Sequence, residues 1–243
     1  MQYPPMSLYV HIPWCEKKCP YCDFNSYASS NIPEQDYLDC LIADLHVEAE
    51  SAQARELRSI FIGGGTPSLF SAKSLAILLQ TVAKKFHFNK DIEVTLEVNP
   101  ASADKRKFLD FFHAGINRLS IGVQSFNDSS LRDLGRIHTG IDGVSAIKLA
   151  QTAGFSNINI DLMYGLPNQS VEEALSDLSA AILQGPQHIS WYELTIEPNT
   201  MFYSNPPNLP KENTLEAIQE AGLAFLFENG YSRYEISAFS KLN

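Results

Sequence analysis

Short runs rich in β-branched and aromatic residues alternate along the chain with longer stretches in which apolar residues recur at helical spacing. Residues 91–98 show the strand pattern most clearly, because apolar and polar side chains alternate there and Asn99-Pro100 ends the run. The predicted strands are residues 7–12, 59–62, 91–98, 118–123, 157–162 and 188–194, with a further run at 234–239. The predicted helices are residues 34–53, 72–85, 103–114, 140–153, 171–183 and 214–228.

Six successive β–α units predict an α/β fold with a parallel sheet and helices outside it. An open doubly wound sheet and a curved barrel both fit this rhythm. The barrel is favoured because polar or glycine-rich residues follow strand after strand: the cysteine-containing loop at residues 15–22, Gly63–Thr66, Glu97, Gln124, Asp161 and Glu193. Six strands are too few for an eight-stranded closure. We therefore expect an open, partial parallel β/α barrel over residues 1–200, and at 201–243 the start of a C-terminal extension that is truncated.

The composition narrows the class of partner. The 243 residues contain 18 Lys and Arg against 28 Asp and Glu, a formal net charge of −10, whereas a general nucleic-acid surface needs clustered basic side chains. No apolar run approaches membrane-spanning length, and the start of the chain lacks the charged and apolar regions of a signal peptide. We therefore expect a cytoplasmic protein with no nucleic-acid partner and no integral membrane segment.

Three cysteines, Cys15, Cys19 and Cys22, lie in one short loop with the spacing C-x3-C-x2-C. Three thiolates hold three corners of a four-iron cluster and leave the fourth iron able to bind a small molecule. Structural zinc is an alternative, although such sites normally have four ligands and His11 is the only nearby fourth candidate. A disulfide is another, but three thiols of one loop cannot all pair with each other. Cys40, at helical spacing within the first predicted helix, is expected to be a small core residue rather than a fourth ligand.

Seven short motifs follow one another along the chain. They are YVHIPWC at residues 9–15, CPYC at 19–22, GGGTPS at 63–68, EVNP at 97–100, IGVQSF at 121–126, LGRIH at 134–138 and DLMYGLP at 161–167. Together they closely resemble the radical S-adenosylmethionine (SAM) proteins related to oxygen-independent coproporphyrinogen oxidase. Within that family the chain is most similar to the HemW-type heme chaperones. The resemblance runs from about Leu8 to the end, and it is the joint pattern that is specific, since a single piece such as GGGTP is weak.

The resemblance implies a set of cofactors, a 4Fe-4S cluster and SAM, and a residue for each contact. Cys15, Cys19 and Cys22 would bind three irons, and the methionine part of SAM would chelate the fourth. Gly64, Gly65 and Thr66 would line that methionine part, and Gln124 and Arg136 would contact its polar end. Glu97 and Asp161 would accept hydrogen bonds from the ribose hydroxyls or the ammonium, and Tyr9 and Tyr21 would pack near the cluster or the adenine. In the family, a reduced cluster then passes one electron to SAM and generates a 5′-deoxyadenosyl radical.

The resemblance also separates two functions. In the porphyrinogen-oxidising enzymes a further cysteine follows two residues after the third cluster cysteine, and here that position is Phe24. This departure favours a heme chaperone, which carries heme as cargo to acceptor proteins such as respiratory enzymes and takes electrons from a reductant protein. Oxidative decarboxylation of coproporphyrinogen III is the alternative, and a non-catalytic module that binds cluster and SAM is a third. Whether the chain is itself an enzyme stays open between these functions. Chaperone-type members also carry a heme motif in a C-terminal region, and nothing of that kind appears before Asn243, so we expect the usual heme ligand to be missing.

Overall fold

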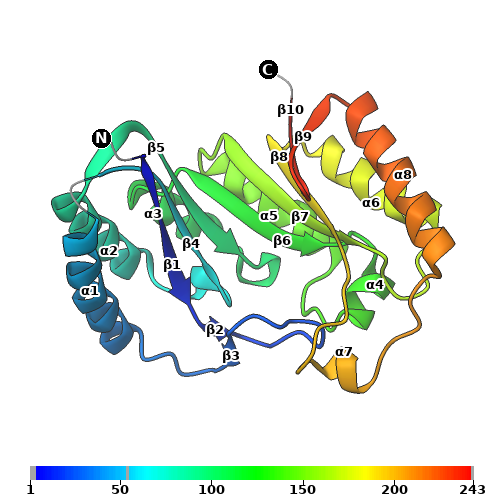
Figure 1. The fold of residues 1–243 in the computed structure, drawn as a ribbon, viewed down its shortest axis with the longest axis horizontal. Coiled ribbons are helices and arrows are strands. Elements are labelled where there is room, and N and C mark those ends of the chain that lie inside the picture. Colours follow the sequence, from blue (N-terminus) through cyan, green and yellow to red (C-terminus); the bar gives the residue numbers. More distant parts are fainter. Residues whose placement is uncertain (1–3, 53–54, 242–243) are drawn as a thin grey trace.

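The structure is a computed structural model that describes residues 4–52 and 55–241. Its centre is a sheet of the strand order β1-β4-β5-β6-β7-β8-β10-β9. The first six of these strands are parallel, and they are β1 (Met6–Ile12), β4 (Glu56–Gly64), β5 (His87–Val98), β6 (Arg118–Gln124), β7 (Asn157–Tyr164) and β8 (His188–Glu193). The sheet curls into an open half-barrel (Figure 1). The predicted α/β fold with six parallel strands and a partial barrel is therefore confirmed.

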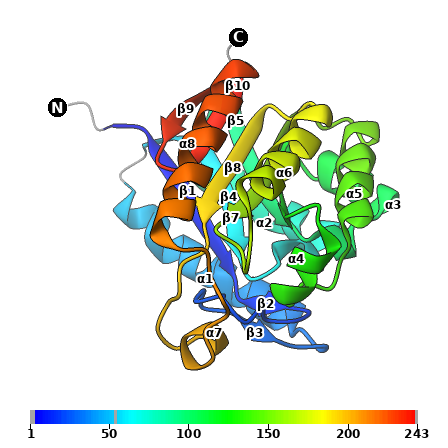
Figure 2. The ribbon, with the colours of Figure 1, turned by 90° about the vertical axis from the view of Figure 1, so that its right-hand side faces the viewer.

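The long helices cover the outer side of the curled sheet. They are α1 (Glu34–Ser51), α2 (Ala72–Lys85), α3 (Lys105–His113), α5 (Gly140–Thr152), α6 (Val171–Leu183) and α8 (Glu212–Glu228). Two short helices, α4 (Asp128–Asp133) and α7 (Met201–Ser204), lie toward the end of the sheet where the parallel strands finish (Figure 1). Figure 2 shows α5, α6 and α8 outside the strands, and α8 packs along α6. The short strands β2 (Trp14–Cys15) and β3 (Tyr27–Ala28) lie at the end of the sheet where the parallel strands finish, opposite the chain termini (Figure 1). This arrangement places the cysteine loop over the carboxyl ends of the strands.

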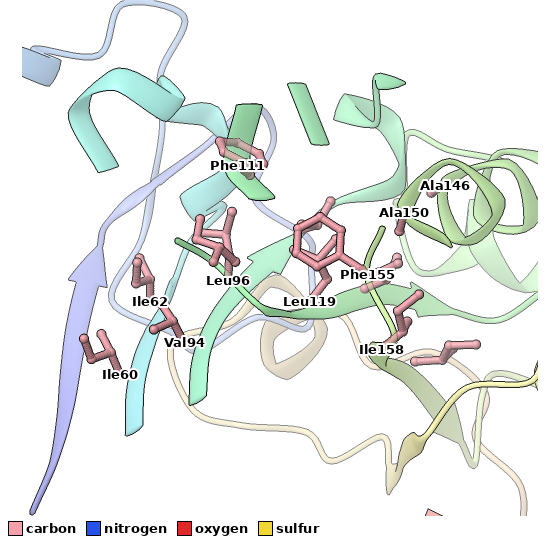
Figure 3. Packing of buried hydrophobic residues seen from close by; sticks show 14 of the residues in the cluster. Ile60, Ile62, Val94, Leu96, Phe111, Leu119, Ala146, Ala150, Phe155 and Ile158 are labelled. Carbon is pink, nitrogen blue, oxygen red and sulfur yellow. The ribbon is translucent and has the colours of Figure 1, made fainter. Parts of the chain in front are cut away.

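The two faces of the sheet differ in chemistry. Outward-facing residues such as Leu96, Leu119 and Ile158 are buried and pack against helix residues such as Phe111 and Ala150 (Figure 3). At about 25 cal/mol per Å² of buried apolar surface, this layer supplies most of the stabilisation of the fold. The inward-facing positions between them are mostly polar, and they line a cavity. The helices therefore hold the sheet from outside and leave the inside available for a ligand.

The C-terminal part differs from the predicted strand at 234–239. The structure instead has two antiparallel strands, β9 (Tyr231–Glu235) and β10 (Ala238–Lys241), joined by a turn at Ile236 and Ser237. β10 pairs antiparallel with β8 and so extends the sheet. The expectation of one strand was wrong because the turn has no Gly, Pro or Asn to mark it in the sequence. The predicted division at residue 200 stays a prediction.

Cys40 is exposed, so the expected core position is wrong. The buried positions of α1 are Leu38 and Leu45, seven residues apart on one face. Cys40 follows Leu38 by two residues, about 200° around the helix, which turns its side chain away from the core. Several helix boundaries also differ from the predictions by one or two residues. α3 starts at Lys105 because the Asp104 side chain accepts from the Lys107 N–H, and α1 ends at Ser51, whereas residue 53 lies outside the described residues.

Candidate functional site

The cysteine loop is a closed loop at the rim of the half-barrel. The parallel pairing of β2 with β3 joins its two ends, and the Cys22 N–H donates to the Cys19 carbonyl oxygen at 3.1 Å. All three thiols are free; Cys15 is buried and the other two are half-buried. Among the described residues, no three or more His, Cys, Asp or Glu side chains gather closely enough to hold one metal ion. A cluster makes a different demand, because each of three thiolates binds a separate iron.

Two side chains fix the shape of this loop. The Lys18 ammonium donates to the carbonyl oxygens of Phe24 and Ser26 at 2.9 and 3.1 Å. His11 Nε2 contacts the Asn25 carbonyl oxygen at 2.8 Å, and its Nδ1 contacts the Tyr9 hydroxyl at 2.9 Å. Because a carbonyl oxygen only accepts, His11 Nε2 carries the proton, and Nδ1 accepts from the tyrosine. Both ring nitrogens are therefore in use within the protein, which argues against His11 as the fourth ligand of a zinc ion.

The glycine segment after β4 is joined directly to the cysteine loop. The Gly65 N–H donates to the Ile12 carbonyl oxygen at 2.8 Å, and the Thr66 N–H donates to that of Trp14 at 2.7 Å. A Cβ atom on Gly65 would lie 2.5 Å from the Trp14 oxygen and 2.9 Å from Cys15 Sγ. Gly64 has φ +119°, a conformation that side chains rarely adopt. Glycine is thus required here by the close approach of the two loops, and Gly64, Gly65 and Thr66 all line the cavity.

Two carboxyl groups lie deeper in the cavity, on β5 and β7. Glu97 Oε2 accepts from the Gly64 N–H at 3.0 Å, which ties β5 to the glycine segment. Burial raises the pKa of Glu97 to about 8, and the nearby Asp161 adds to that shift, whereas the Gly64 hydrogen bond opposes it. Burial also raises the pKa of Asp161, although its oxygens accept from Ser120 at 3.1–3.2 Å and from Asn159 at 2.7 Å. A cation in the cavity would favour the ionised form of both groups.

Gln124 and Arg136 bring hydrogen-bond donors to the rim. Gln124 is the last residue of β6, and its Oε1 accepts from the Tyr192 hydroxyl at 2.6 Å. Arg136 follows α4; its Nη2 donates to the Gly122 carbonyl oxygen at 2.7 Å, and its Nη1 lies 3.5 Å from Cys19 Sγ. The buried Nε of Arg136 has no partner among the described residues. An acceptor such as a carboxylate would satisfy that donor.

The two tyrosines of the predicted site have different surroundings. Tyr21 lines the cavity beside the cysteine loop and packs against Phe202 of α7, with ring centroids 6.3 Å apart. Tyr9 is 56% exposed, stacks on Phe61, and is not one of the cavity-lining residues. The structure therefore brings together eleven of the twelve predicted site residues around the cavity and its cysteine loop, and leaves Tyr9 beside the lining residue Phe61 but outside the lining itself.

The cavity has a volume of about 930 Å³ and an acidic lining. Its carboxyl side chains are Asp23, Glu93, Glu97, Asp161, Glu193 and Glu197, against the cationic Lys17, Arg118 and Arg136. A volume of this size fits a cofactor-sized ligand, and the excess of carboxyl groups favours a positively charged one. SAM carries a sulfonium, an ammonium and one carboxylate, and it fits both the acidic lining and the unpartnered donor of Arg136. The three thiols, the glycine segment and the cavity thus fit a cluster together with SAM.

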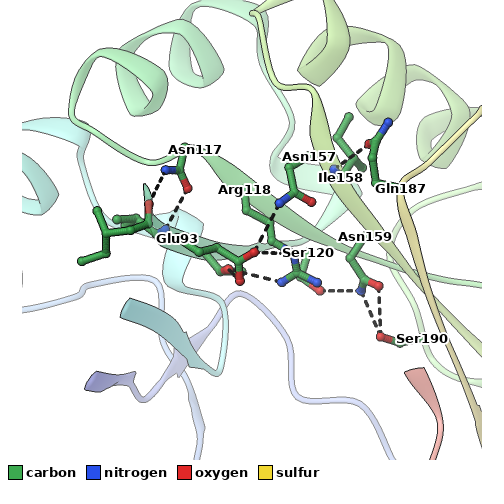
Figure 4. A network of polar contacts seen from close by, with 12 residues as sticks. Glu93, Asn117, Arg118, Ser120, Asn157, Ile158, Asn159, Gln187 and Ser190 are labelled. Atoms are coloured by element: carbon green, nitrogen blue, oxygen red, sulfur yellow. Dashed lines mark hydrogen bonds and ion pairs between the residues drawn. The ribbon is translucent and has the colours of Figure 1, made fainter. Parts of the chain in front are cut away.

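A polar network continues from the cavity wall to the beginnings of the strands. Glu93 lies 3.8 Å from Arg118 Nε, and Asn159 bonds to Ser120 at 2.9 Å and to Ser190 at 3.0 Å (Figure 4). Sequence reasoning missed these residues and Tyr192, which also lines the cavity. The available signal was the alternation within residues 118–123, 157–162 and 188–194, whose polar members all fall on the inner face.

Comparisons with known proteins agree with this site. Residues 9–181 match the radical SAM superfamily. The chain is 54% identical to the heme chaperone HemW of Haemophilus influenzae, with 98% of this chain and 63% of that protein covered. It is 50% identical to the heme chaperone HemW of Escherichia coli, with 99% and 64% covered. The chain thus spans less than two thirds of the length of these relatives.

A solved structure shows the same fold. Coproporphyrinogen III oxidase (HemN) from Escherichia coli, described as a radical SAM enzyme, superposes with a TM-score of 0.88 at 29% identity, covering 98% of this chain and 56% of that one. Across the part of the chain that the structure describes, every helix is too short or too polar to span a bilayer. The family match, the half-barrel and the three-cysteine loop lead to one conclusion: this chain belongs to the radical SAM superfamily.

Proposed function

We propose that this chain is the cluster- and SAM-binding part of a heme chaperone that delivers heme to acceptor proteins. Cys15, Cys19 and Cys22 would hold a 4Fe-4S cluster, and SAM would bind in the adjoining cavity. When bound, the cluster supplies one-electron chemistry at the SAM sulfonium. The single observation that carries the proposal is the loop of three free thiols joined by backbone hydrogen bonds to a glycine segment at the mouth of an acidic cavity.

The residues of the chain have distinct tasks in this proposal. Gly64, Gly65 and Thr66 let the ligand approach the backbone next to the cysteine loop. Gln124 and Arg136 donate to the ligand carboxylate, and the carboxyl groups of the cavity offset the positive charge of the ligand. Tyr21 and the helix α7 cover the loop from the side, where the Phe202 N–H donates to the Pro20 carbonyl oxygen at 3.0 Å and limits the access of water. Tyr9 would act through His11, by holding the imidazole that fixes the loop.

The heme-carrying role rests on the two relatives with at least 50% identity, both heme chaperones. The charge of the cavity agrees with it. A porphyrinogen with four carboxylates would meet six carboxyl side chains against three cationic ones in this cavity. The propionates of heme would meet the same carboxyl side chains, so heme would bind outside the half-barrel, and a reductant protein would supply electrons at the cysteine-loop side.

A second candidate is oxidation of coproporphyrinogen III, which the likeness to the Escherichia coli oxidase favours. Phe24 discriminates between the two, because the resemblance predicts a fourth loop cysteine at that position in the enzymes. Phe24 lines the cavity mouth and is 57% exposed. We therefore place the oxidase second.

An anaerobic experiment tests the proposal in two steps. The chain is reconstituted with iron and sulfide, reduced with dithionite, and studied by electron paramagnetic resonance with and without SAM. A four-iron signal that changes on addition of SAM is expected; bound zinc, or a signal that SAM leaves unchanged, would contradict the assignment of the site. Titration with hemin and an assay with coproporphyrinogen III then separate the two functions: heme binding without decarboxylation supports the chaperone, and decarboxylation supports the oxidase.

A further inference from the structure

Gln124 has a backbone conformation that its residue type does not favour. Its φ is +70°, in the left-handed region where residues other than glycine are uncommon, and its side chain is buried. The pairing of β6 with β7 is irregular between Gly122 and Gln124. A conformation of this kind persists when surrounding contacts determine it.

The first of these contacts is made by Asp177 on α6. The Ser125 hydroxyl donates to Asp177 Oδ2 at 2.7 Å, and the Phe126 N–H donates to Asp177 Oδ1 at 2.7 Å. Asp177 is 4% exposed, and both of its oxygens are occupied by the turn that directly follows Gln124. Asp177 therefore fixes the backbone on the C-terminal side of Gln124 from outside the barrel.

The second contact is made by Tyr192 on β8, inside the barrel. Its hydroxyl donates to Gln124 Oε1 at 2.6 Å. With Oε1 engaged, the Nε2 group is turned the other way, over Gly122, where a Cβ atom would lie 3.0 Å from it. The carbonyl oxygen of Gly122 in turn accepts from Arg136, whose Nε is buried without a partner among the described residues. Two donors from different elements thus lie beside the same glycine.

We propose that Tyr192 and Asp177 are positioning residues that hold the Gln124 amide as a donor toward a ligand carboxylate, next to Arg136. Tyr192 sets which end of the amide faces the ligand, and Asp177 sets where the amide lies. A carboxylate accepts from two such donors at once, whereas a ligand without a carboxylate gains nothing from them. This inference rests on the proposed function, because it takes the carboxylate of SAM as the group recognised.

The test compares two ligands on the reconstituted protein: SAM and decarboxylated SAM, which lacks only the carboxylate. Equilibrium dialysis gives the dissociation constants for the wild type, Tyr192→Phe and Asp177→Asn. We expect either substitution to weaken SAM binding roughly tenfold, the size expected for a lost hydrogen bond to a charged group. The affinity for decarboxylated SAM should stay unchanged. Tyr231→Phe is the matched control, because its hydroxyl donates to the Pro186 carbonyl oxygen and Tyr231 is not a cavity-lining residue.

A double-mutant cycle supplies a readout that a purely structural role would not move. In a Gln124→Ala background, Tyr192→Phe should have no further effect on the affinity for SAM. Equal losses for both ligands, an unchanged affinity for SAM, or additive losses in the cycle would overturn the inference. If the wild type holds a cluster but binds neither ligand, the proposed function fails, and this inference with it. Thermal melting of each variant confirms that the folded protein is being compared.

Discussion

The two faces of strands β5 to β8 have opposite chemistry, although alternate residues of the same four segments form them. The outer face carries Val94, Leu96, Leu119, Ile121, Val123, Ile158, Ile160, Leu162, Ile189 and Trp191, all in the core under the helices. The inner face carries Glu93, Glu97, Arg118, Ser120, Gly122, Gln124, Asn159, Asp161, Met163, His188, Ser190 and Tyr192, all lining the cavity. A parallel sheet covered by protein on both faces normally has apolar residues on both. The polar inner face is therefore suited to a polar ligand. Along each strand, residues that stabilise the core alternate with residues that line the cavity.

The largest effect should come from the cavity side, where the loop thiols hold the metal. Replacing Cys19 or Cys22 by Ala removes one of three ligands, so the iron and sulfide content after reconstitution should fall from about four per chain to near zero. The stability of the cluster-free protein should change little, because both thiols are only half-buried. Cys40→Ala is the control, since this exposed thiol on α1 lies away from the loop. Full iron content in the Cys19 variant would contradict the assignment of ligands.

The next effect comes from the outer face. Ile121→Ala removes a fully buried side chain between β6 and the helices, and should lower the free energy of unfolding by about 2–5 kcal/mol. Urea denaturation of the cluster-free protein measures it. The control Ile236→Ala changes a side chain that is 86% exposed, and should stay within about 0.5 kcal/mol of the wild type. The fraction of Ile121→Ala protein that folds should still take up iron normally; a selective loss of iron would show that the two faces are not independent.

A glycine substitution sharpens the comparison further. Gly65→Ala places a methyl group against Trp14 and Cys15, so it should cost about 1–3 kcal/mol and also reduce cluster uptake. Gly143→Ala is the matched outer-face substitution, because its Cβ would meet Val123 at 3.0 Å on the far side of β6. It should change stability alone. Circular dichroism melts and iron analysis of both variants distinguish the outcomes, and identical behaviour of the two would contradict the account.

The last prediction concerns the dependence of stability on pH and on Glu97. Burial raises the pKa of Glu97 from 4.5 to about 8, so between these values the folded chain holds a proton that the unfolded chain has released. This group therefore lowers stability progressively as pH rises through that window. Glu97→Gln removes the dependence, and its free energy of unfolding relative to the wild type should increase from about pH 5 to pH 8 in urea denaturation of the reduced, cluster-free protein. A constant difference between the two proteins would show that Glu97 is ionised in the fold throughout.

Most of the fold and the positions of several site residues could be predicted from the sequence, because local periodicity or turn chemistry marks them there. The six parallel strands are visible as short β-rich runs. The site residues Glu97, Gln124 and the glycine segment from Gly63 are visible because polar or glycine residues end those runs. The turn at Ile236 and Ser237 leaves no such mark, and the exposure of Cys40 depends on which face of α1 meets the sheet.

The supporting contacts of the site could not be predicted. Tyr192 and Gln124 are 68 residues apart, and Asp177 and Ser125 are 52 apart, so only the curvature of the sheet and the packing of α6 bring these pairs together. Likewise, the sequence places Tyr9 next to the cysteine loop, whereas its 56% exposure depends on the position of β1 at the edge of the sheet.

One spectroscopic measurement tests the central claim most directly, that three protein thiolates leave one iron free for SAM. The reduced, reconstituted chain is mixed with SAM labelled with ¹⁵N in its amino group and ¹⁷O in its carboxylate, and electron–nuclear double resonance is recorded. Hyperfine coupling of both labels to the cluster is the predicted result, because both groups would bind the fourth iron. A four-iron signal without coupling from either label would show that this iron is closed by another ligand, and would contradict the account.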